Sequence, residues 1–351
     1  MTSRERLVVI GNGMAGARFV EEVVARGGSD RFDITVFGEE PYGNYNRILL
    51  SSVLANTHDP EDIFLNPVSW YEQHGVSLLI GVRAGWIDRL ARKVLAPGGV
   101  VVPYDRLVLA TGSTPFVPPL DGVYTEEGTL KEGAFAFRTL ADCDGIIQRV
   151  SGSRTAAVIG GGLLGLEAAR GLMARGLEVH LVHLMADLME TQLDPAGAAI
   201  LRSTLERMGL QIHLEKATTG IRSAEAVEGL SFSDGSTLAC DLVVISAGIR
   251  PNTDLARQAG LAVQRGIVVH DDLSCRNSED IYAIGECIQH RGVTYGLVAP
   301  VWDQARVLAD RMASGSQAVY TGSRVSTKLK VMGVDLAVMG EKEAAADTDE
   351  V

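Results

Sequence analysis

The 351-residue sequence lacks the cysteine patterns that mark several redox and metal sites. Its four cysteines are too far apart for a C-x-x-C motif, at Cys143, Cys240, Cys275 and Cys287. Neither a thioredoxin-like dithiol nor a cysteine-ligated iron–sulfur cluster therefore has a recognisable site. We interpret the four thiols as buried or unreactive, and we expect no metal site.

Positive charge and long apolar runs are also scarce. Lysine and arginine number 32 against 44 aspartates and glutamates, a formal net charge of −12. This balance argues against nucleic acid and anionic membrane surfaces as partners. No apolar run has the length of a membrane span, and the N-terminus has no signal-peptide core. We therefore expect a cytoplasmic protein, whose length suits two domains.

What the sequence does contain is one glycine pattern in two copies. Each copy follows a short apolar run and opens an amphipathic stretch, as a strand followed by a helix would. The pattern G-x-G-x-x-G occurs at Gly11, Gly13 and Gly16, and again at Gly160, Gly162 and Gly165. The first glycine makes a tight turn, the second lets phosphates approach the backbone, and the third lets the helix pack on the strand. Two copies predict two dinucleotide sites, with electrons passing between the dinucleotides.

The residues around the two motifs predict alternating strands and helices. We expect strands at 7–10, 34–37, 76–80, within 100–113, at 156–159, near 210–214 and 228–233, at 242–246 and from 281. We expect helices at 14–26, 163–175, 195–208 and 301–313. We expect the chain to cross between two domains at two places. The first is marked by three prolines between 115 and 119, and the second by the pair Ala247-Gly248. The first and last parts are therefore expected to form one domain, which the middle part interrupts.

An acidic residue after each second strand would bind a ribose. After the first motif, Glu39 and Glu40 are both candidates, and the sequence does not choose between them. After the second motif the equivalent residue is His183, which is neither a carboxylate nor part of an arginine cluster. The lack of basic residues near 180–190 favours NADH, with NADPH as an alternative donor.

Four segments in this order resemble the pyridine nucleotide–disulfide oxidoreductase superfamily: 11–16, 110–113, 160–165 with Glu167, and 281–286. Segments 45–52, 182–194, 285–300 and 326–335 further resemble the N-terminal flavoprotein module of the assimilatory NAD(P)H nitrite reductase large subunit. The resemblance implies an α/β fold of two Rossmann-like, three-layer dinucleotide-binding domains. An FAD-binding domain (1–117 and 245–318) would hold an inserted NAD(P)H-binding domain (118–244). A truncated interface segment with an acidic tail (319–351) would follow.

The resemblance also implies roles for individual residues. FAD would contact Gly11, Gly13, Met14, Ala15, Gly16, Glu39, Glu40, Arg47, Ser52, Ala110, Thr111, Gly112, Gly285, Glu286 and Trp302. NADH would contact Gly160, Gly162, Leu163, Leu164, Gly165, Glu167 and Gly248. Glu167 would face the nicotinamide from the first turn of its helix. No residue is expected to act as a catalytic acid, base or nucleophile, because the alignment of nicotinamide and flavin supplies most of the protein's contribution.

The activity implied is that of an FAD-dependent NAD(P)H:acceptor oxidoreductase. Hydride would pass from NADH to FAD, and electrons would pass on to a separate iron–sulfur or sirohaem partner. Peroxidase, oxidase and disulfide reductase activities are not expected, since no cysteine precedes Cys143. The chain also lacks the cysteine-rich modules that would allow it to reduce nitrite by itself. A ferredoxin or rubredoxin reductase and a flavin-bound redox sensor or scaffold with little turnover are the alternatives, and the oligomeric state is left open.

Overall fold

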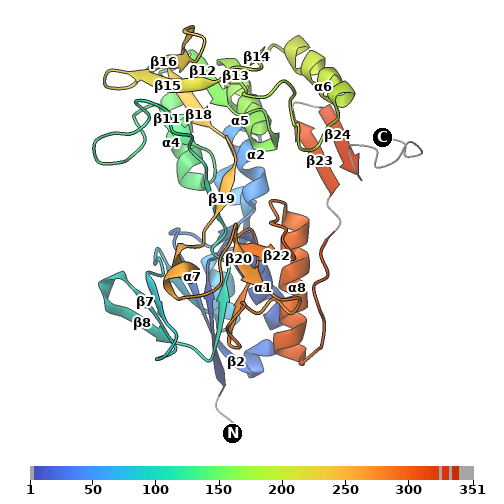
Figure 1. Cartoon of the computed structure of the whole chain (residues 1–351). Coiled ribbons are helices and arrows are strands. Elements are labelled where there is room, and N and C mark those ends of the chain that lie inside the picture. The colour runs from blue at the N-terminus through green and yellow to red at the C-terminus, as the bar shows by residue number, and fades with distance from the viewer. Residues whose placement is uncertain (1–3, 324–325, 332–333, 340–351) are drawn as a thin grey trace, which may run out of the picture. The chain divides into compact units, whose positions relative to one another are not determined.

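The computed structural model describes residues 4–323, 326–331 and 334–339. The chain forms two compact units (Figure 1). The first unit takes its residues from 1–46, 64–114 and 251–325, and the second from 47–63, 115–250 and 326–351. The family resemblance implied that residues 47–63 belong to the first domain, whereas they group here with the second unit. The assignment of FAD to one unit and NAD(P)H to the other stays a prediction.

A five-stranded parallel sheet forms the core of the first unit. Its strands follow the order β21-β9-β1-β2-β5. They span Ile281–Ala283 (β21), Arg106–Leu109 (β9), Glu5–Ile10 (β1), Phe32–Gly38 (β2) and Ser77–Ile80 (β5). Leu7, Val9, Val36 and Leu107 are fully buried, as expected where helices or loops cover both faces of a parallel sheet.

Helices and small sheets complete the first unit. Helix α1 (Met14–Ala25) packs against α8 (Val298–Ser314), and the two ribbons lie side by side in Figure 1. Short helices α3 (Val68–Gln73), α7 (Asp254–Gln258), η1 (Gly28–Asp30) and η4 (Pro97–Gly99) lie in the connections. A three-stranded antiparallel sheet contains β6 (Trp86–Asp88), β7 (Lys93–Ala96) and β8 (Val100–Pro103). Two strand pairs are β3 (Asn44–Tyr45) with β4 (Phe64–Asn66), and β20 (Ile267–Val269) with β22 (Ile288–His290).

The second unit repeats the plan of the first. Its parallel sheet has the order β11-β18-β12-β13-β14. The strands span Ala134–Ala136 (β11), Leu242–Ile245 (β18), Thr155–Ile159 (β12), Glu178–Val182 (β13) and Gln211–His213 (β14). In each sheet, the strand that precedes a glycine motif occupies the centre. The predicted α/β fold, with one Rossmann-like unit inserted in another, is confirmed.

Helices α4 (Leu140–Val150), α5 (Leu163–Ala174) and α6 (Pro195–Arg207) belong to the second unit. So do α2 (Leu50–Leu54), η2 (Arg47–Leu49) and η3 (Pro60–Ile63). Gly171 explains why the 47–63 segment joins this unit, because a side-chain carbon at Gly171 would lie 2.6 Å from Leu54 Cγ. Arg175 adds a hydrogen bond from its guanidinium to the carbonyl of Val53, at 3.2 Å.

An antiparallel sheet of β15 (Thr218–Ser223), β16 (Val227–Phe232) and β17 (Thr237–Ala239) is part of the second unit, as is the pair β23 (Ser326–Val331) and β24 (Val334–Met339). The long central segment of the second unit, residues 115–250, begins within β10 (Ser113–Pro115) and ends within β19 (Ile249–Pro251), and these two strands pair. Among the described residues, no helix is both long and apolar enough to cross a bilayer.

Candidate dinucleotide-binding sites

The first glycine motif forms the turn between β1 and α1. Gly11 directly follows β1 and has a φ of +115°, which L-residues with side chains rarely adopt. A side-chain carbon at Gly11 would lie 2.2 Å from the carbonyl oxygen of Ala110, and one at Gly16 would lie 1.9 Å from the oxygen of Gly11. Glycine is therefore required at both positions, because neighbouring backbone atoms leave no room for a side chain.

The second motif reproduces this geometry between β12 and α5. Gly160 has a φ of +124°, and a side-chain carbon there would lie 2.1 Å from the carbonyl oxygen of Ser246. At Gly165 such a carbon would lie 2.0 Å from the oxygen of Gly160. Gly162 differs, because a side-chain carbon there would meet no protein atom within 4 Å. Its missing side chain leaves space that the protein itself does not use.

Both turns have the chemistry that a dinucleotide pyrophosphate requires. Gly13 and Gly162 are the N-cap residues of α1 and α5, and neither has a side-chain cap. The first N–H groups of each helix therefore point to a site at the positive end of the helix dipole. Each turn also lies at the carboxyl end of the central strand, where the order of the strands reverses and α/β proteins bind ligands. Met14, Ala15, Leu163 and Leu164 are the first residues of these helices.

Asn12, between the first two motif glycines, is a polar group that sequence reasoning missed. Its Oδ1 accepts a hydrogen bond of 2.6 Å from the hydroxyl of Tyr71, which is fully buried. Burial raises the pKa of the Tyr71 hydroxyl, so this group remains a donor. The Nδ2 of Asn12 is buried and has no hydrogen-bond partner within the protein. A donor of this kind in the glycine turn fits an oxygen-rich ligand.

The segment after β9 runs beside the first glycine turn. Thr111 Oγ1 donates to the carbonyl of Asn252 at 2.8 Å, and Asn252 Nδ2 donates to the carbonyl of Thr111 at 2.8 Å. Gly112, with a φ of +66°, accepts from the backbone N–H of Asn252. Asn252 therefore holds the predicted Thr111-Gly112 pair in place, although no sequence motif marks it. In the second unit, Gly248 (φ +108°) takes the corresponding place after β18.

The turn after β21 also approaches the first glycine motif. A side-chain carbon at Gly285 would lie 2.8 Å from the Cβ of Ala15. The N–H of Gly285 donates to Oε1 of Gln304, a fully buried residue of α8, at 2.7 Å. Next to it, Glu286 accepts a hydrogen bond of 2.7 Å from the hydroxyl of Ser113. The structure thus brings together three segments that are far apart in the sequence: 11–16, 110–113 and 285–286.

The two acidic candidates after β2 have different surroundings. The side chain of Glu39 is 64% exposed and lies 3.3 Å from Arg83. Glu40 accepts a hydrogen bond of 2.6 Å from the hydroxyl of Tyr45. Both follow Gly38, the last residue of β2, so both stay candidates for the ribose.

Three further residues predicted to contact FAD lie outside the turns. Arg47 and Ser52 are grouped with the second unit, where Arg47 donates to the carbonyl of Arg138 at 3.0 Å. Trp302, on α8, has the guanidinium of Arg18 5.4 Å from its ring centroid. A contact between the flavin and any of these side chains stays a prediction.

His183 directly follows β13 and is buried, with 8% of its surface exposed. Its Nδ1 accepts a hydrogen bond of 3.0 Å from the N–H of Gly161, within the second glycine motif. Its Nε2 lies 3.1 Å from Oε2 of Glu190. Sequence reasoning assigned His183 no role, and its position after the second strand was the only signal that could have suggested one.

Glu167 lies in the first turns of α5, where its side chain is half-buried. Burial raises the pKa of this carboxyl group to about 7, and the nearby positive charge of Arg170 opposes part of the rise. The group therefore exchanges a proton near neutral pH, unlike an ordinary glutamate.

All four cysteines are unpaired and buried, which confirms their interpretation. Burial raises the pKa of Cys143 and of Cys240 to about 12, so neither thiol is a ready nucleophile. Within the part of the chain that the structure describes, no group of three or more His, Cys, Asp or Glu residues could hold a metal ion.

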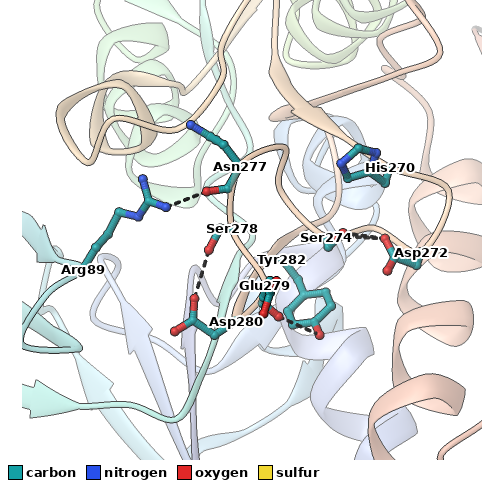
Figure 2. A pocket seen from close by; sticks show the side chains of 9 residues that line it. All are labelled: Arg89, His270, Asp272, Ser274, Asn277, Ser278, Glu279, Asp280 and Tyr282. Atoms are coloured by element: carbon teal, nitrogen blue, oxygen red, sulfur yellow. Dashed lines mark hydrogen bonds between the residues drawn. The ribbon is translucent and has the colours of Figure 1, made fainter.

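A polar pocket of about 590 Å³ lies elsewhere in the first unit (Figure 2). Its lining consists of Arg89, His270, Asp272, Ser274, Asn277, Ser278, Glu279, Asp280 and Tyr282. The guanidinium of Arg89 closes one side by donating to the carbonyl of Asn277 at 2.7 Å. The pocket lies at the amino end of β21, since Asp280 directly precedes this strand. The glycine turns lie at carboxyl ends of parallel strands, so this pocket is not part of the candidate dinucleotide site.

The family model "pyridine nucleotide-disulphide oxidoreductase" matches residues 5–322. Among curated proteins, the nitrite reductase [NAD(P)H] of Bacillus subtilis (strain 168) is 45% identical over 338 residues, which are 96% of this chain and 41% of that protein. The chain thus spans about two fifths of the length of this relative.

Two other relatives match over most of their length. The rubredoxin-NAD(+) reductase of Alcanivorax borkumensis is 32% identical, over 90% of this chain and 81% of that protein. Among solved structures, the covalent putidaredoxin reductase–putidaredoxin complex is similar with a TM-score of 0.88 and 26% identity. That match covers 97% of this chain and 82% of the solved chain.

Proposed function

Since the chain belongs to the pyridine nucleotide-disulphide oxidoreductase family, an enzyme family that uses FAD and NAD(P)H, we propose that it transfers electrons from NADH through FAD to a separate redox partner. In this proposal the first unit binds FAD and the second binds NADH. The partner is an iron–sulfur or sirohaem protein or module. The resemblance to a nitrite reductase supports this kind of partner.

The pair of glycine turns is the observation that carries the proposal. Both turns place uncapped helix N-termini at the switch point of a parallel sheet. In both, a neighbouring carbonyl oxygen leaves no room for a side chain at the first glycine. A protein with one dinucleotide needs one such turn. Two turns in separate units support two dinucleotides, and electron transfer between them is the chemistry that this arrangement serves.

In the first unit, we propose that the backbone of residues 11–16 holds the FAD pyrophosphate. Glu39 or Glu40 would accept hydrogen bonds from the hydroxyl groups of the adenosine ribose. Glu286 would accept hydrogen bonds from the hydroxyl groups of the ribityl chain. In the second unit, residues 160–165 would hold the NADH pyrophosphate. When bound, FAD supplies a two-electron acceptor for hydride. The protein's part is to orient the two cofactors, which requires no nucleophile or strong base.

Glu167 is the side chain that we expect to orient the nicotinamide ring of the dinucleotide bound in the second unit. Its raised pKa keeps a large share of the carboxyl groups protonated near neutral pH. The neutral form can both donate and accept a hydrogen bond, as an amide ligand requires. The proposed role is therefore to orient the nicotinamide and not to transfer a proton.

A rubredoxin or ferredoxin reductase is the second candidate. The rubredoxin-NAD(+) reductase matches this chain over most of both sequences, which the nitrite reductase does not. The two candidates share the NADH and FAD steps and differ only in the acceptor. A comparison of NADH-dependent electron transfer to rubredoxin and to a sirohaem-containing reductase module distinguishes them.

An anaerobic titration of the FAD-loaded chain tests the proposal. NADH is added first and NADPH in a separate sample, while the visible absorption of the flavin is followed. We expect about one equivalent of NADH to bleach the flavin within seconds. A yellow protein that neither nucleotide bleaches would contradict the proposal and would favour a flavin-bound sensor or scaffold with little turnover.

A further inference from the structure

A small pocket at the amino end of the first unit's parallel sheet is rich in arginine. Its volume is about 190 Å³. Phe32 and Arg106 line it, and they are the first residues of β2 and β9. The glycine turn of this unit follows β1 at the opposite, carboxyl end of the same sheet. The complete lining consists of Arg31, Phe32, Arg106, Tyr282, Arg311, Met312, Gly315, Ser316 and Gln317.

The charge of this arginine pocket is opposite in sign to that of the chain, whose formal net charge is −12. Among the described residues, two carboxylates approach its three guanidinium groups. Glu5 lies 3.3 Å from both Arg31 and Arg106. Asp272 lies 3.5 Å from Arg311. These distances exceed the roughly 2.7–2.9 Å of a tight charge-assisted hydrogen bond. Three positive charges thus face two loosely paired negative charges, and the excess favours an anion.

Backbone carbonyl groups hold the three arginines in place. Nη1 of Arg31 donates to the carbonyl of Met312 at 2.9 Å, and Nη1 of Arg311 donates to that of Ala318 at 2.9 Å. Arg106 makes a longer contact, 3.4 Å, with a carbonyl of the segment before β21. A guanidinium has five N–H donors, so each arginine has donors left for a ligand. Because the side chains are already held, little order has to be created on binding.

The arginine pocket is open enough for a ligand to enter. The side chains of Arg31, Arg106 and Arg311 are 45%, 36% and 21% exposed. Ser316 adds a neutral donor to the lining. Its Oγ accepts a hydrogen bond of 3.0 Å from the N–H of Ala318, so its own O–H can donate to a ligand. The pocket therefore offers charged and neutral donors to the same small volume.

We propose that the arginine pocket binds a small phosphate-type anion, either inorganic phosphate or the phosphate monoester of a small metabolite. Guanidinium groups bind phosphate oxygens in pairs and keep their charge at physiological pH. The volume of about 190 Å³ lies below the roughly 300–1,000 Å³ of pockets for drug-sized ligands. A phosphate group with few further atoms fits this size, whereas a dinucleotide does not. The inference does not depend on the proposed electron transfer.

Isothermal titration calorimetry with inorganic phosphate and with glycerol 3-phosphate tests the proposal. Saturating FAD and ADP-ribose are present throughout, so that neither phosphate enters a glycine turn. We expect one site per wild-type chain. Arg106→Gln should weaken binding about tenfold, the usual effect of one lost charged hydrogen bond. Arg106→Lys should weaken it less, because lysine keeps the charge and loses only the planar fork. Tighter binding of glycerol 3-phosphate would identify the ligand as a monoester, and equal binding would identify free phosphate as sufficient.

Arg4→Gln is the matched control. It removes one positive charge beside β1 at the same edge of the sheet, and Arg4 does not line the pocket. Because this side chain is 53% exposed, its loss should change the affinity by less than about twofold. Equal losses in Arg106→Gln and Arg4→Gln, with both variants folded by circular dichroism, would overturn the proposal. A wild-type chain that binds neither phosphate, or that binds succinate equally tightly, would also overturn it.

Discussion

Glu167 lies within the first two turns of α5, where burial opposes ionisation and raises its carboxyl pKa to about 7. In the unfolded chain the same group would have its ordinary pKa near 4.5. The folded protein therefore binds this proton more tightly than the unfolded chain does. This contribution to stability is complete at low pH and is lost as the pH rises through about 7.

Replacement of Glu167 by Gln should consequently stabilise the protein at alkaline pH. A glutamine is neutral at every pH and has nearly the same shape, so the cost of burying a charge disappears. We expect the free energy of unfolding to rise by about 2 kcal/mol at pH 8.5 and to change little at pH 5. Urea unfolding at both pH values measures the difference.

Glu126→Gln serves as the control for the Glu167 prediction, because Glu126 is exposed. It should have no comparable effect at either pH. A Glu167→Gln variant that is equally destabilised at pH 5 and pH 8.5 would show that burial does not raise the pKa of this carboxyl group.

At the scale of elements, the glycines of the strand–turn–helix motif are of two kinds. One kind is required by the backbone conformation, and the other has open space around it. Gly160 is required by the protein, because its φ is positive and a carbonyl oxygen occupies the place of a side chain. Gly162 has an ordinary negative φ of −83° and open space around it. The first glycine builds the turn, and the second leaves open space beside the helix N-terminus, where we propose that the ligand binds.

Alanine at these two positions should therefore have different consequences. Gly160→Ala is expected to lower the free energy of unfolding by about 3 kcal/mol or more, since strain and overlap act together. Gly162→Ala should keep stability within about 0.5 kcal/mol of the wild type and weaken ADP-ribose binding at least about tenfold. Chemical denaturation and calorimetry measure the two effects. Equal stability losses in both variants would contradict the distinction.

At the scale of the whole molecule, two units with the same sheet plan are assembled from a discontinuous chain. The first unit has three segments in the sequence, and two of them meet at Gly11 and Ala110. The family match and the paired turns support electron transfer between bound cofactors. All four thiols of the chain are unpaired and buried. A cytoplasmic location stays a prediction.

We therefore predict that the purified 351-residue chain, loaded with FAD, reduces ferricyanide with NADH but does not reduce nitrite. One-electron dyes accept electrons from a reduced flavin without a protein partner, whereas nitrite requires six electrons from a centre that the cysteines of this chain do not provide. Dye absorbance and a colorimetric nitrite assay check the two outcomes. Nitrite loss at the rate of dye reduction would contradict the prediction.

Much of the fold could be predicted because its signals are local. Strand 34–37 and helix 195–208 correspond to β2 (Phe32–Gly38) and α6 (Pro195–Arg207). The helix boundary is clear because the side chain of Asp194 accepts from the N–H of Gly197 at 3.0 Å and Pro195 follows in the first turn. The three-stranded sheet β6–β8 was not predicted, since its strands are only three or four residues long.

The candidate site also has a part that could be predicted from the sequence and a part that could not. The sequence by itself determined the two glycine turns, because positive φ angles and close backbone contacts require glycine at fixed spacing. Only the tertiary structure brought Asn252 to Thr111 and joined His183 to Gly161 and Glu190. Those contacts depend on where side chains from separate elements meet in space. No spacing rule along the chain encodes such a meeting, so it became visible only in the folded molecule.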